Sequence, residues 1–179
     1  MKHVVLTGFM AVGKTAVGRR LAKRLGYEFV DTDRLIEQHS AMSVAEIFEK
    51  LGEEEFRRRE RELVAGLAPT APTVFATGGG TFIDEENQRR LKAVGVVVCL
   101  VTSLETILQR VGRNEARPLA AGDARQRLAA LYEKRKPAYG RADVLVETDG
   151  LSVDQAVSRV LTMIGPYLKD NVPGAVTPS

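Results

Sequence analysis

The sequence predicts an α/β fold in which helices cover both faces of a mostly parallel sheet. Five short, predominantly apolar runs are separated by segments that have helical periodicity or helix-capping residues. This alternation is typical of parallel strands joined by crossover helices. At roughly 150 residues per domain, the 179 residues make about one domain, which is long enough to bury one sizeable core.

The five predicted strands are short runs at residues 3–7, 28–31, 73–77, 95–101 and 143–148. The first run is rich in β-branched residues, which favour extended backbone. A glycine-containing loop follows the first run, and a run of three glycines follows the third. These two loops are therefore expected at the carboxyl ends of their strands.

The predicted helices are bounded by capping residues, glycine and proline. Val17, Leu21 and Leu25 form an apolar stripe with helical spacing, and Gly26 follows as a stop signal. Capping boxes open two further helices at residues 43 and 152. The expected helical ranges are 14–25, 43–51, 53–67, 84–93, a helix that opens at residue 103, 123–139 and 152–164.

The composition excludes several classes of protein. A single cysteine, Cys99, rules out an internal disulfide scaffold and a cysteine-rich metal site. The longest uncharged run, 63–83, contains Pro69 and Pro72 and is not expected to span a membrane. The N-terminus lacks the long apolar core and cleavage site of a signal peptide, so a cytoplasmic location is expected. The net charge of +3 excludes little until its distribution is considered.

The segment 8–15, GFMAVGKT, matches the pattern G-x-x-x-x-G-K-[ST] between a predicted strand and a predicted helix. Glycine lets backbone N–H groups approach phosphate oxygens, and the helix N-terminus adds positive potential. Lys14 would reach the β- and γ-phosphates, and the Thr15 hydroxyl would bind Mg²⁺. The motif alone leaves open a kinase, a nucleotide hydrolase or a switch protein. The expected nucleotide-binding residues in and beside this segment are Gly8, Ala11, Val12, Gly13, Lys14, Thr15 and Ala16.

Two carboxylates stand at the carboxyl end of the second predicted strand, where α/β sheets bind their ligands. Asp31 and Asp33 are two residues apart, a spacing that places side chains on the same side of a strand. One would hold the hydration shell of the metal, and the other would accept a proton or hydrogen bond from an acceptor hydroxyl. The alternative is that Asp33 only caps the next helix.

A cluster of arginines and a run of three glycines complete the predicted acceptor side. Residues 56–61, FRRRER, hold more arginine than a solvated helix face requires, and arginine forms planar, bidentate pairs with carboxylates. One or two of these arginines are expected to anchor an acidic substrate, and the others to face solvent. Residues 78–80, all glycine, would contact substrate or γ-phosphate through their backbone, and a flexible turn is the alternative.

Positive charge is concentrated in a second segment, 110–136, which contains eight lysines and arginines and three acidic residues. Within it, the polar loop RPLAAG at 117–122 has the character of a lid. Arg117 on such a lid would stabilise the transferring charge. Only Tyr132 and Tyr139 interleave with the basic residues, which is a weak pattern for nucleic-acid binding.

The combination and order of these motifs resemble the shikimate kinase family over about residues 2–165. The matching segments are the phosphate loop 8–15, Asp31 to Asp33, Phe56 and Arg57 with Glu60, the three glycines 78–80, Arg117 to Leu119, and Arg135 with Pro137 and Tyr139. Ala11 stands where the family often has glycine, and Ala138 where leucine is common. The segment 149–153 matches poorly, so no adenine-contacting residue is assigned there.

The resemblance implies transfer of the γ-phosphoryl group of ATP to the 3-hydroxyl of shikimate, in the chorismate route to aromatic amino acids. It gives catalytic roles to Lys14, Asp33 and Arg117, with Arg117 touching the transferring phosphate. It also implies that Arg110 stacks on adenine, and that Mg²⁺ is held by Thr15 and, through water, by Asp31. The implied substrate-binding residues are Asp33, Arg57, Gly78, Gly79, Gly80 and Arg135, of which the two arginines clamp the shikimate carboxylate.

The resemblance also implies a three-layer P-loop kinase fold of the nucleoside-monophosphate-kinase type, with a five-stranded parallel sheet flanked by helices. Residues 1–165 would form one domain, with a substrate-binding helical region at about 33–61 and a lid at about 112–124. Residues 166–179 would form a flexible tail. A cytoplasmic monomer that binds neither nucleic acid nor membranes is expected. Two alternatives stay open: another small-molecule kinase of the same fold, such as one for gluconate, and a non-catalytic nucleotide-binding module.

Overall fold

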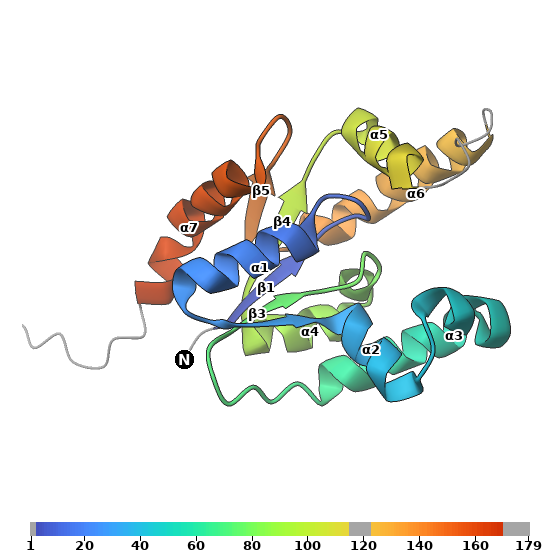
Figure 1. Cartoon of the computed structure of the whole chain (residues 1–179), viewed down its shortest axis with the longest axis horizontal. Coiled ribbons are helices and arrows are strands. Elements are labelled where there is room, and N and C mark those ends of the chain that lie inside the picture. Colours follow the sequence, from blue (N-terminus) through green and yellow to red (C-terminus); the bar gives the residue numbers. More distant parts are fainter. Residues whose placement is uncertain (1–2, 115–122, 170–179) are drawn as a thin grey trace, which may run out of the picture.

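A five-stranded parallel sheet lies at the centre of the chain in a computed structural model that describes residues 3–114 and 123–169. Its strands, in the spatial order β2-β3-β1-β4-β5, are all parallel to their neighbours. The predicted fold class is therefore confirmed, and the strand limits agree with the predicted ones to within one residue. The strands are β1 (His3–Thr7), β2 (Glu28–Asp31), β3 (Thr73–Ala76), β4 (Gly95–Val101) and β5 (Val144–Glu147) (Figure 1).

Strand β1 is the centre of the sheet, because β3 and β4 pair with it on its two sides. Val5 lies opposite Phe75 of β3 and opposite Val97 of β4. All residues of β1 and β3 are buried, whereas the edge strand β5 alternates buried and exposed side chains. Burial on both faces explains why the central strands are continuous apolar runs in the sequence.

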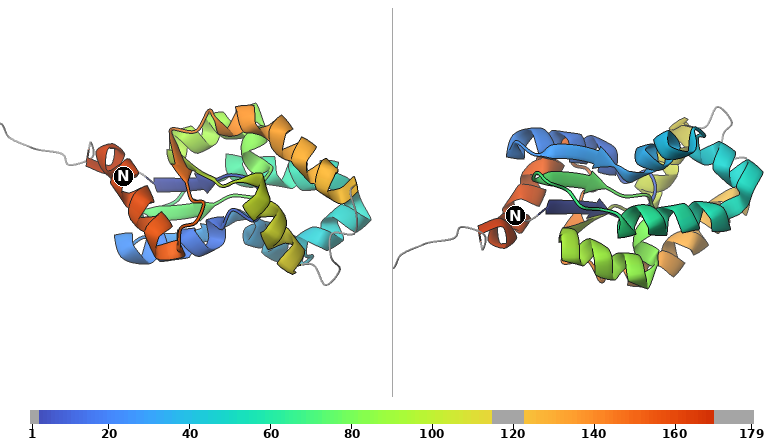
Figure 2. Two further views of the ribbon diagram at one scale, coloured as in Figure 1. Left: turned by 90° about the horizontal axis from the view of Figure 1, so that it is seen from above. Right: turned by 90° about the horizontal axis from the view of Figure 1, so that it is seen from below.

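Helices cover both faces of the sheet, as Figure 2 shows from above and from below. Helix α1 (Lys14–Leu25) packs against α7 (Val153–Lys169) on one face, and α4 (Glu85–Val94) lies on the other. Leu21 of the predicted apolar stripe is fully buried in the main core. Gly26 ends α1 with a left-handed φ of 69°, so both limits of this helix are as predicted.

Two helical excursions project beyond the carboxyl ends of the strands (Figure 1). The first consists of α2 (Thr32–Ser40) and α3 (Val44–Ala65), and the second of α5 (Leu104–Asn114) and α6 (Asp123–Tyr139). A short 3₁₀ helix, η1 (Thr81–Ile83), lies between them in the chain. The excursions therefore flank the edge of the sheet at which ligands of α/β folds bind.

The first excursion has a small core of its own. Ile36, Ile47 and Phe56 pack together, apart from the main core around the sheet. The predicted capping box at Ser43 begins α3, and Gly52 interrupts the helix with a φ of 86°. The interruption falls where the sequence predicted a boundary between two helices. Among the described residues, no helix is both long and apolar enough to cross a bilayer.

Two predicted boundaries were wrong. Helix α7 continues through Pro166 to Lys169, so residues 166–169 do not belong to a tail. Tyr167 packs against the main core, and its hydroxyl donates to the Asp143 carbonyl at 3.2 Å, which holds the last turn although proline lacks an N–H. Helix α5 reaches Asn114, inside the segment expected to form a loop, because Val111 packs against the core. Of the other expected lid residues, 115–122 lie outside the described residues, as does the expected tail after 169, whereas 123–124 begin helix α6.

Candidate active site

The loop between β1 and α1 has a backbone shape that requires glycine at its first position. Gly8 adopts a φ of 132°, and a Cβ atom there would lie 2.5 Å from the Leu100 carbonyl oxygen. Gly13, with a φ of 96°, is the N-cap residue of α1 and offers no side chain to the first N–H groups of the helix. These amides are therefore directed at the loop, where they and the helix dipole favour an anion.

Ala11 adopts the same kind of backbone without being glycine. Its φ of 61° is in the left-handed region, which costs an alanine about 1–2 kcal/mol. The family that the motifs resemble often has glycine at this position, and the left-handed φ gives the physical reason. Strain of this kind persists where the surrounding structure holds a loop in shape, and it is common at ligand sites.

Lys14 folds back over the start of this loop. Its Nζ atom donates to the carbonyl oxygens of Gly8 at 2.9 Å and Phe9 at 2.8 Å. Burial lowers the pKa of Lys14 to about 8, and the negative charge of Asp33 opposes that shift. A bound phosphate would favour the charged ammonium group in the same way as Asp33 does, and more strongly because of its greater charge.

Thr15 and Asp31 form a pair of oxygen ligands beside the loop. Thr15 Oγ1 donates to Asp31 Oδ2 at 2.8 Å. Asp31 Oδ1 accepts from the backbone N–H groups of Asp33 at 3.2 Å and Arg34 at 3.4 Å, so Asp31 caps α2. The alternative in which Asp33 caps this helix is therefore wrong. The strand-spacing argument was also wrong, because β2 ends at Asp31 and Asp33 lies in the first turn of α2.

The pair formed by Thr15 and Asp31 fits Mg²⁺. This ion keeps several waters and is bound by one or two protein oxygens together with the phosphates of its substrate. In the described ranges, no group of three histidine, cysteine, aspartate or glutamate side chains offers a complete metal cage. Two oxygens of this kind suit a metal that completes its coordination with water and with the phosphates of a ligand.

Asp33 is a partly buried carboxylate, one oxygen of which has no hydrogen-bond donor among the described residues. Its Oδ1 atom is buried and accepts no hydrogen bond from any described residue. Burial, followed by the negative charges of Glu60 and Asp31, raises the pKa of Asp33 to about 6. A buried acceptor without a partner is costly, and this oxygen lies against Gly78, close to Glu60. A pKa near the working pH also suits a group that accepts a proton during catalysis.

The loop, the oxygen pair and Asp33 surround one cavity of about 530 Å³ at the carboxyl edge of the sheet. A larger groove of about 770 Å³ lies between α3 and the face of β2 and β3, and none of the predicted site residues lines it. The chemistry therefore identifies the smaller cavity as the candidate active site. Its lining residues are Met10, Ala11, Gly13, Lys14, Thr15, Ala16, Asp31, Asp33, Thr77, Gly78, Gly79 and Arg110.

A second cavity of about 300 Å³ adjoins the first at Ala11, Gly13 and Arg110. Arg110 Nη1 donates to the Ala11 carbonyl at 3.0 Å, which holds the guanidinium group between the two cavities. Residues 151–153, which follow β5, line the second cavity, although no residue was assigned there from the sequence. Topology could have indicated them, because the carboxyl ends of parallel strands meet at one edge of the sheet.

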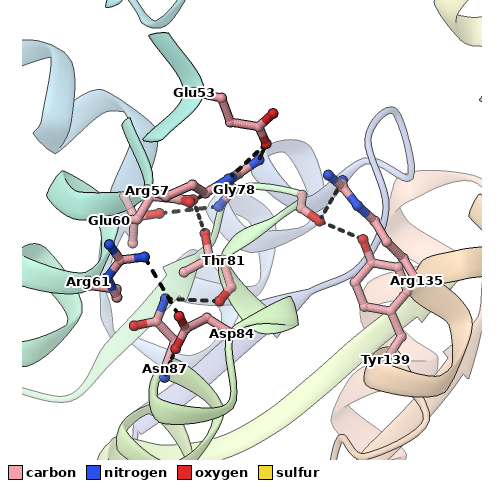
Figure 3. A network of polar contacts seen from close by, with 12 residues as sticks. Glu53, Arg57, Glu60, Arg61, Gly78, Thr81, Asp84, Asn87, Arg135 and Tyr139 are labelled. Carbon is pink, nitrogen blue, oxygen red and sulfur yellow. Dashed lines mark hydrogen bonds and ion pairs between the residues drawn. The ribbon is translucent and has the colours of Figure 1, made fainter. Parts of the chain in front are cut away.

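Arg57 is held by two carboxylates of its own helix (Figure 3). Its Nε and Nη2 atoms donate to Glu53 at 3.2 and 3.0 Å, and Nη1 pairs with Glu60. Only 2% of the Glu60 side chain is exposed, and Glu60 also accepts from Thr81 Oγ1 at 2.5 Å. The guanidinium group lies against Gly80, where a Cβ atom would clash with it. Arg57 is thus fixed beside the glycine turn.

The other arginines of the cluster do not approach that turn. Arg58 and Arg59 both pair with Glu55 on α3, and Arg61 is directed toward the N-terminus of α4. Such pairs at a helix surface contribute little to stability. Of the four arginines, Arg57 is therefore the one that lies against the glycine turn.

The carbonyl oxygen of Gly79 accepts hydrogen bonds from two side chains of α6. Arg135 Nη1 donates to it at 3.3 Å and Tyr139 Oη at 2.5 Å, on the opposite side of Figure 3 from Arg57. The Arg135 guanidinium also lies over the Phe9 ring, 5.8 Å from its centroid. Neither Arg57 nor Arg135 lines the cavity wall, and the two approach the glycine turn from opposite excursions.

Arg117 lies outside the described residues. The sequence prediction gave no role to Glu60, Thr81 or Tyr139, although Glu60 and Tyr139 belong to the motifs it used. Glu60 could have been found, because a residue three positions after Arg57 lies on the same face of a helix. The contacts of Thr81 and Tyr139 had no signal in the sequence, since their partners are distant along the chain.

A phosphate-binding loop and a carboxylate line the same cavity, and such an arrangement suits phosphoryl transfer. The class of protein so defined is the P-loop kinases. A family model for shikimate kinase matches residues 10–165. The chain belongs to the shikimate kinase family, which makes it an ATP-dependent kinase and confirms the resemblance drawn from its motifs.

Relatives named shikimate kinase match most of the chain. The protein of Ruegeria pomeroyi is 47% identical over 165 residues, which cover 91% of this chain and 85% of the relative. The protein of Thermodesulfovibrio yellowstonii is 41% identical over 162 residues, which cover 90% of this chain and 94% of the relative. The solved shikimate kinase from Acinetobacter baumannii, in complex with shikimate, has a TM-score of 0.85 and 36% identity, with 97% of this chain and 96% of that chain covered. A gluconokinase from Sinorhizobium meliloti has a TM-score of 0.61 at 14% identity, which shows a shared fold alone.

Proposed function

We propose that the chain transfers the γ-phosphoryl group of ATP to the 3-hydroxyl of shikimate, with the residues around the cavity in the roles that follow. The observation that carries this proposal is the placement of the Asp33 carboxylate in the cavity that Lys14 and the glycine turn also line. A substrate with several hydroxyls and one carboxylate suits Asp33 together with Arg57 and Arg135, and shikimate is such a substrate.

On the nucleotide side, the loop amides and Lys14 bind the β- and γ-phosphates. Lys14 exchanges its two carbonyl acceptors, Gly8 and Phe9, for phosphate oxygens. Arg110 stacks on adenine in the second cavity, with residues 151–153 as the opposite wall. Loss of the carbonyl partners costs little, because charge-assisted bonds to phosphate are stronger than those to a neutral carbonyl.

Thr15 and Asp31 would hold Mg²⁺, Asp31 through water. The ion, when bound, neutralises part of the charge on the β- and γ-phosphates. The Thr15 hydroxyl turns from Asp31 to serve as a ligand. Asp31 stays in place, because its other oxygen caps α2.

On the acceptor side, Asp33 orients the substrate hydroxyl and takes its proton. The new bond forms between that oxygen and the γ-phosphorus, and the bond from phosphorus to the bridging oxygen breaks, which releases ADP. Arg57 and Arg135 bind the carboxylate of the substrate, and the backbone of Gly79 and Gly80 contacts it. Arg117 would touch the transferring phosphate. Positioning and charge neutralisation supply most of the rate enhancement.

The proposed activity makes the chain a supplier of shikimate 3-phosphate in the chorismate route to aromatic amino acids. We further propose that it acts as a cytoplasmic monomer without nucleic-acid or membrane partners. One domain would hold both substrates, with the α2–α3 excursion serving as the acceptor-binding region.

A coupled assay of ADP release tests the proposed function directly. With ATP and Mg²⁺, we expect turnover that depends on added shikimate and yields shikimate 3-phosphate, after subtraction of the rate without acceptor. Gluconate in place of shikimate is the matched acceptor control, since it also carries hydroxyls and one carboxylate. Turnover with gluconate alone, or tight ATP binding without transfer to either acceptor, would contradict the proposal.

The pKa of Asp33 predicts the acid side of the pH profile. Asp33 accepts a proton only as a carboxylate, so kcat/KM for shikimate should fall about tenfold per unit as the pH drops below about 6. A profile that stays flat from pH 7 down to pH 4.5 would contradict this role.

The pKa of Lys14 predicts the alkaline side of the pH profile. In kcat/KM for ATP, which reports the free enzyme, activity should decline above about pH 8 as the ammonium group loses its proton. In kcat this decline should move to higher pH, because bound phosphates raise the pKa of Lys14. The three profiles are measured between pH 4.5 and 9.5.

A further inference from the structure

Tyr139 contacts the glycine turn but has no part in the proposed chemistry. It is the last residue of α6 and is only 5% exposed. Its hydroxyl donates to the Gly79 carbonyl at 2.5 Å, and Gly79 lines the cavity that holds the reacting groups. A side chain of the second excursion thus holds the backbone of the acceptor site.

Tyr139 shares its acceptor with Arg135, which lies one helical turn earlier. A carbonyl oxygen has two lone pairs and accepts both donors. The bond from Arg135 Nη1 is long, at 3.3 Å, whereas the bond from the Tyr139 hydroxyl is at the short end of its range. Tyr139 is therefore the principal donor to Gly79, and Arg135 is the donor that exchanges readily.

The hydroxyl of Tyr139 is available as a donor throughout the working range of pH. Burial raises the pKa of Tyr139 to about 12, although the positive charges of Arg135 and Arg57 act against that shift. The turn also lies close to the phosphate loop, because a Cβ atom on Gly79 would lie only 3.2 Å from the backbone nitrogen of Met10.

We propose that Tyr139 is a positioning residue, which keeps the Gly79 carbonyl bonded when the Arg135 guanidinium leaves it for the carboxylate of the acceptor substrate. This inference rests on the proposed role of Arg135. Without the tyrosine hydroxyl, release of Arg135 would leave the Gly79 carbonyl with no side-chain donor among the described residues, and that cost would weaken substrate binding. Tyr139 thereby frees Arg135 for the substrate and acts on affinity for the acceptor rather than on the chemical step.

The Tyr139→Phe variant tests this role, because it removes the hydroxyl and keeps the ring. We expect KM for shikimate to rise about five- to tenfold, the loss that corresponds to one uncompensated hydrogen bond. KM for ATP and kcat should stay within about twofold of wild type. An unchanged KM for shikimate, or a loss confined to kcat, would overturn the proposal.

Tyr132→Phe is the matched control. Tyr132 lies on the same helix, is 7% exposed, and donates its hydroxyl to the Thr102 carbonyl at 3.0 Å. Both variants should lower the melting temperature by similar amounts, which measures the structural cost of losing such a bond. Only Tyr139→Phe should raise KM for shikimate, and equal changes in the two variants would refute a specific role.

A double-mutant cycle with Arg135 separates this mechanism from a general loosening of the site. In an Arg135→Ala background, Tyr139→Phe should change KM for shikimate by less than about twofold, since residues that act as one unit are not additive. A full additive effect in that background would contradict action through Arg135. Wild-type turnover is measured first, and its absence would contradict the proposed function. If wild-type turnover is normal and Tyr139→Phe leaves KM for shikimate unchanged, only the proposed role of Tyr139 is contradicted.

Discussion

Asp33→Asn should lower kcat for shikimate-dependent ADP release by about 10²–10⁴-fold. The substitution keeps the size of the side chain and one acceptor oxygen, but it removes the negative charge and the ability to take a proton. KM for ATP should change little, because the nucleotide is held on the other side of the cavity. The acid side of the pH profile, set by the pKa of Asp33 at about 6, should disappear with the carboxylate.

The control for this variant is the same chemical change at a site without function. Asp154 pairs with Arg20 at the surface, and 62% of its side chain is exposed. Asp154→Asn should leave kcat and both KM values within about twofold of wild type, since exposed ion pairs contribute little. If Asp33→Asn retained more than about a third of wild-type kcat, the assignment of Asp33 as the proton acceptor would be wrong.

Arg57→Ala should lower kcat/KM for shikimate by about 10²–10³-fold, mainly through KM. The variant loses a planar, charged partner for the substrate carboxylate. It also leaves Glu60, whose side chain is only 2% exposed, without its counter-ion. The free energy of unfolding should therefore fall as well, by about 2–4 kcal/mol, because a buried charge without a partner is costly. Steady-state kinetics and denaturant unfolding measure the two effects separately.

Arg59→Ala provides the comparison within the same helix. Arg59 and Arg57 are equally exposed, at 26% and 25%, but Arg59 pairs with Glu55 and does not approach the glycine turn. Arg59→Ala should therefore leave kcat/KM for shikimate within about threefold of wild type. The kcat/KM of Arg57→Lys for shikimate should lie between those of the two alanine variants, because lysine keeps the charge and loses the bidentate geometry. Small and equal losses in both alanine variants would refute the carboxylate-binding role of Arg57.

The fold could be predicted from the sequence because its elements are defined by interactions between near neighbours. The apolar stripe at Val17, Leu21 and Leu25, the stop at Gly26 and the capping box at Ser43 all act within a few residues. Helix α2 was not predicted, and the two wrong boundaries arose where distant contacts extended an element. Helix α7 passes Pro166 because Tyr167 packs on the core, and that contact has no local sign in the sequence.

The candidate site was predictable to the extent that its parts are contiguous. The phosphate loop is one segment, so its motif alone predicted the position of Lys14 and Thr15. The carboxylates were found but given the wrong geometry, since the sequence did not reveal that β2 ends at Asp31 and that Asp31 caps the helix. The two carboxylates, for which we propose the tasks of holding a metal shell and of facing a hydroxyl, are therefore separated by the start of α2.

The order of strands and helices, the phosphate loop and the residue types of the acceptor side follow from the sequence, because local periodicity, capping and motif spacing encode them. The hydrogen bonds that orient those side chains do not follow from the sequence. Glu60 is hydrogen-bonded to Thr81, 21 positions away in the sequence, and Tyr139 to Gly79, 60 positions away. Each of these hydrogen bonds depends on how whole helices pack on the sheet. The same packing places Arg57 and Arg135 on either side of one glycine turn, and it brings Asp33 to the wall of the cavity beside that turn.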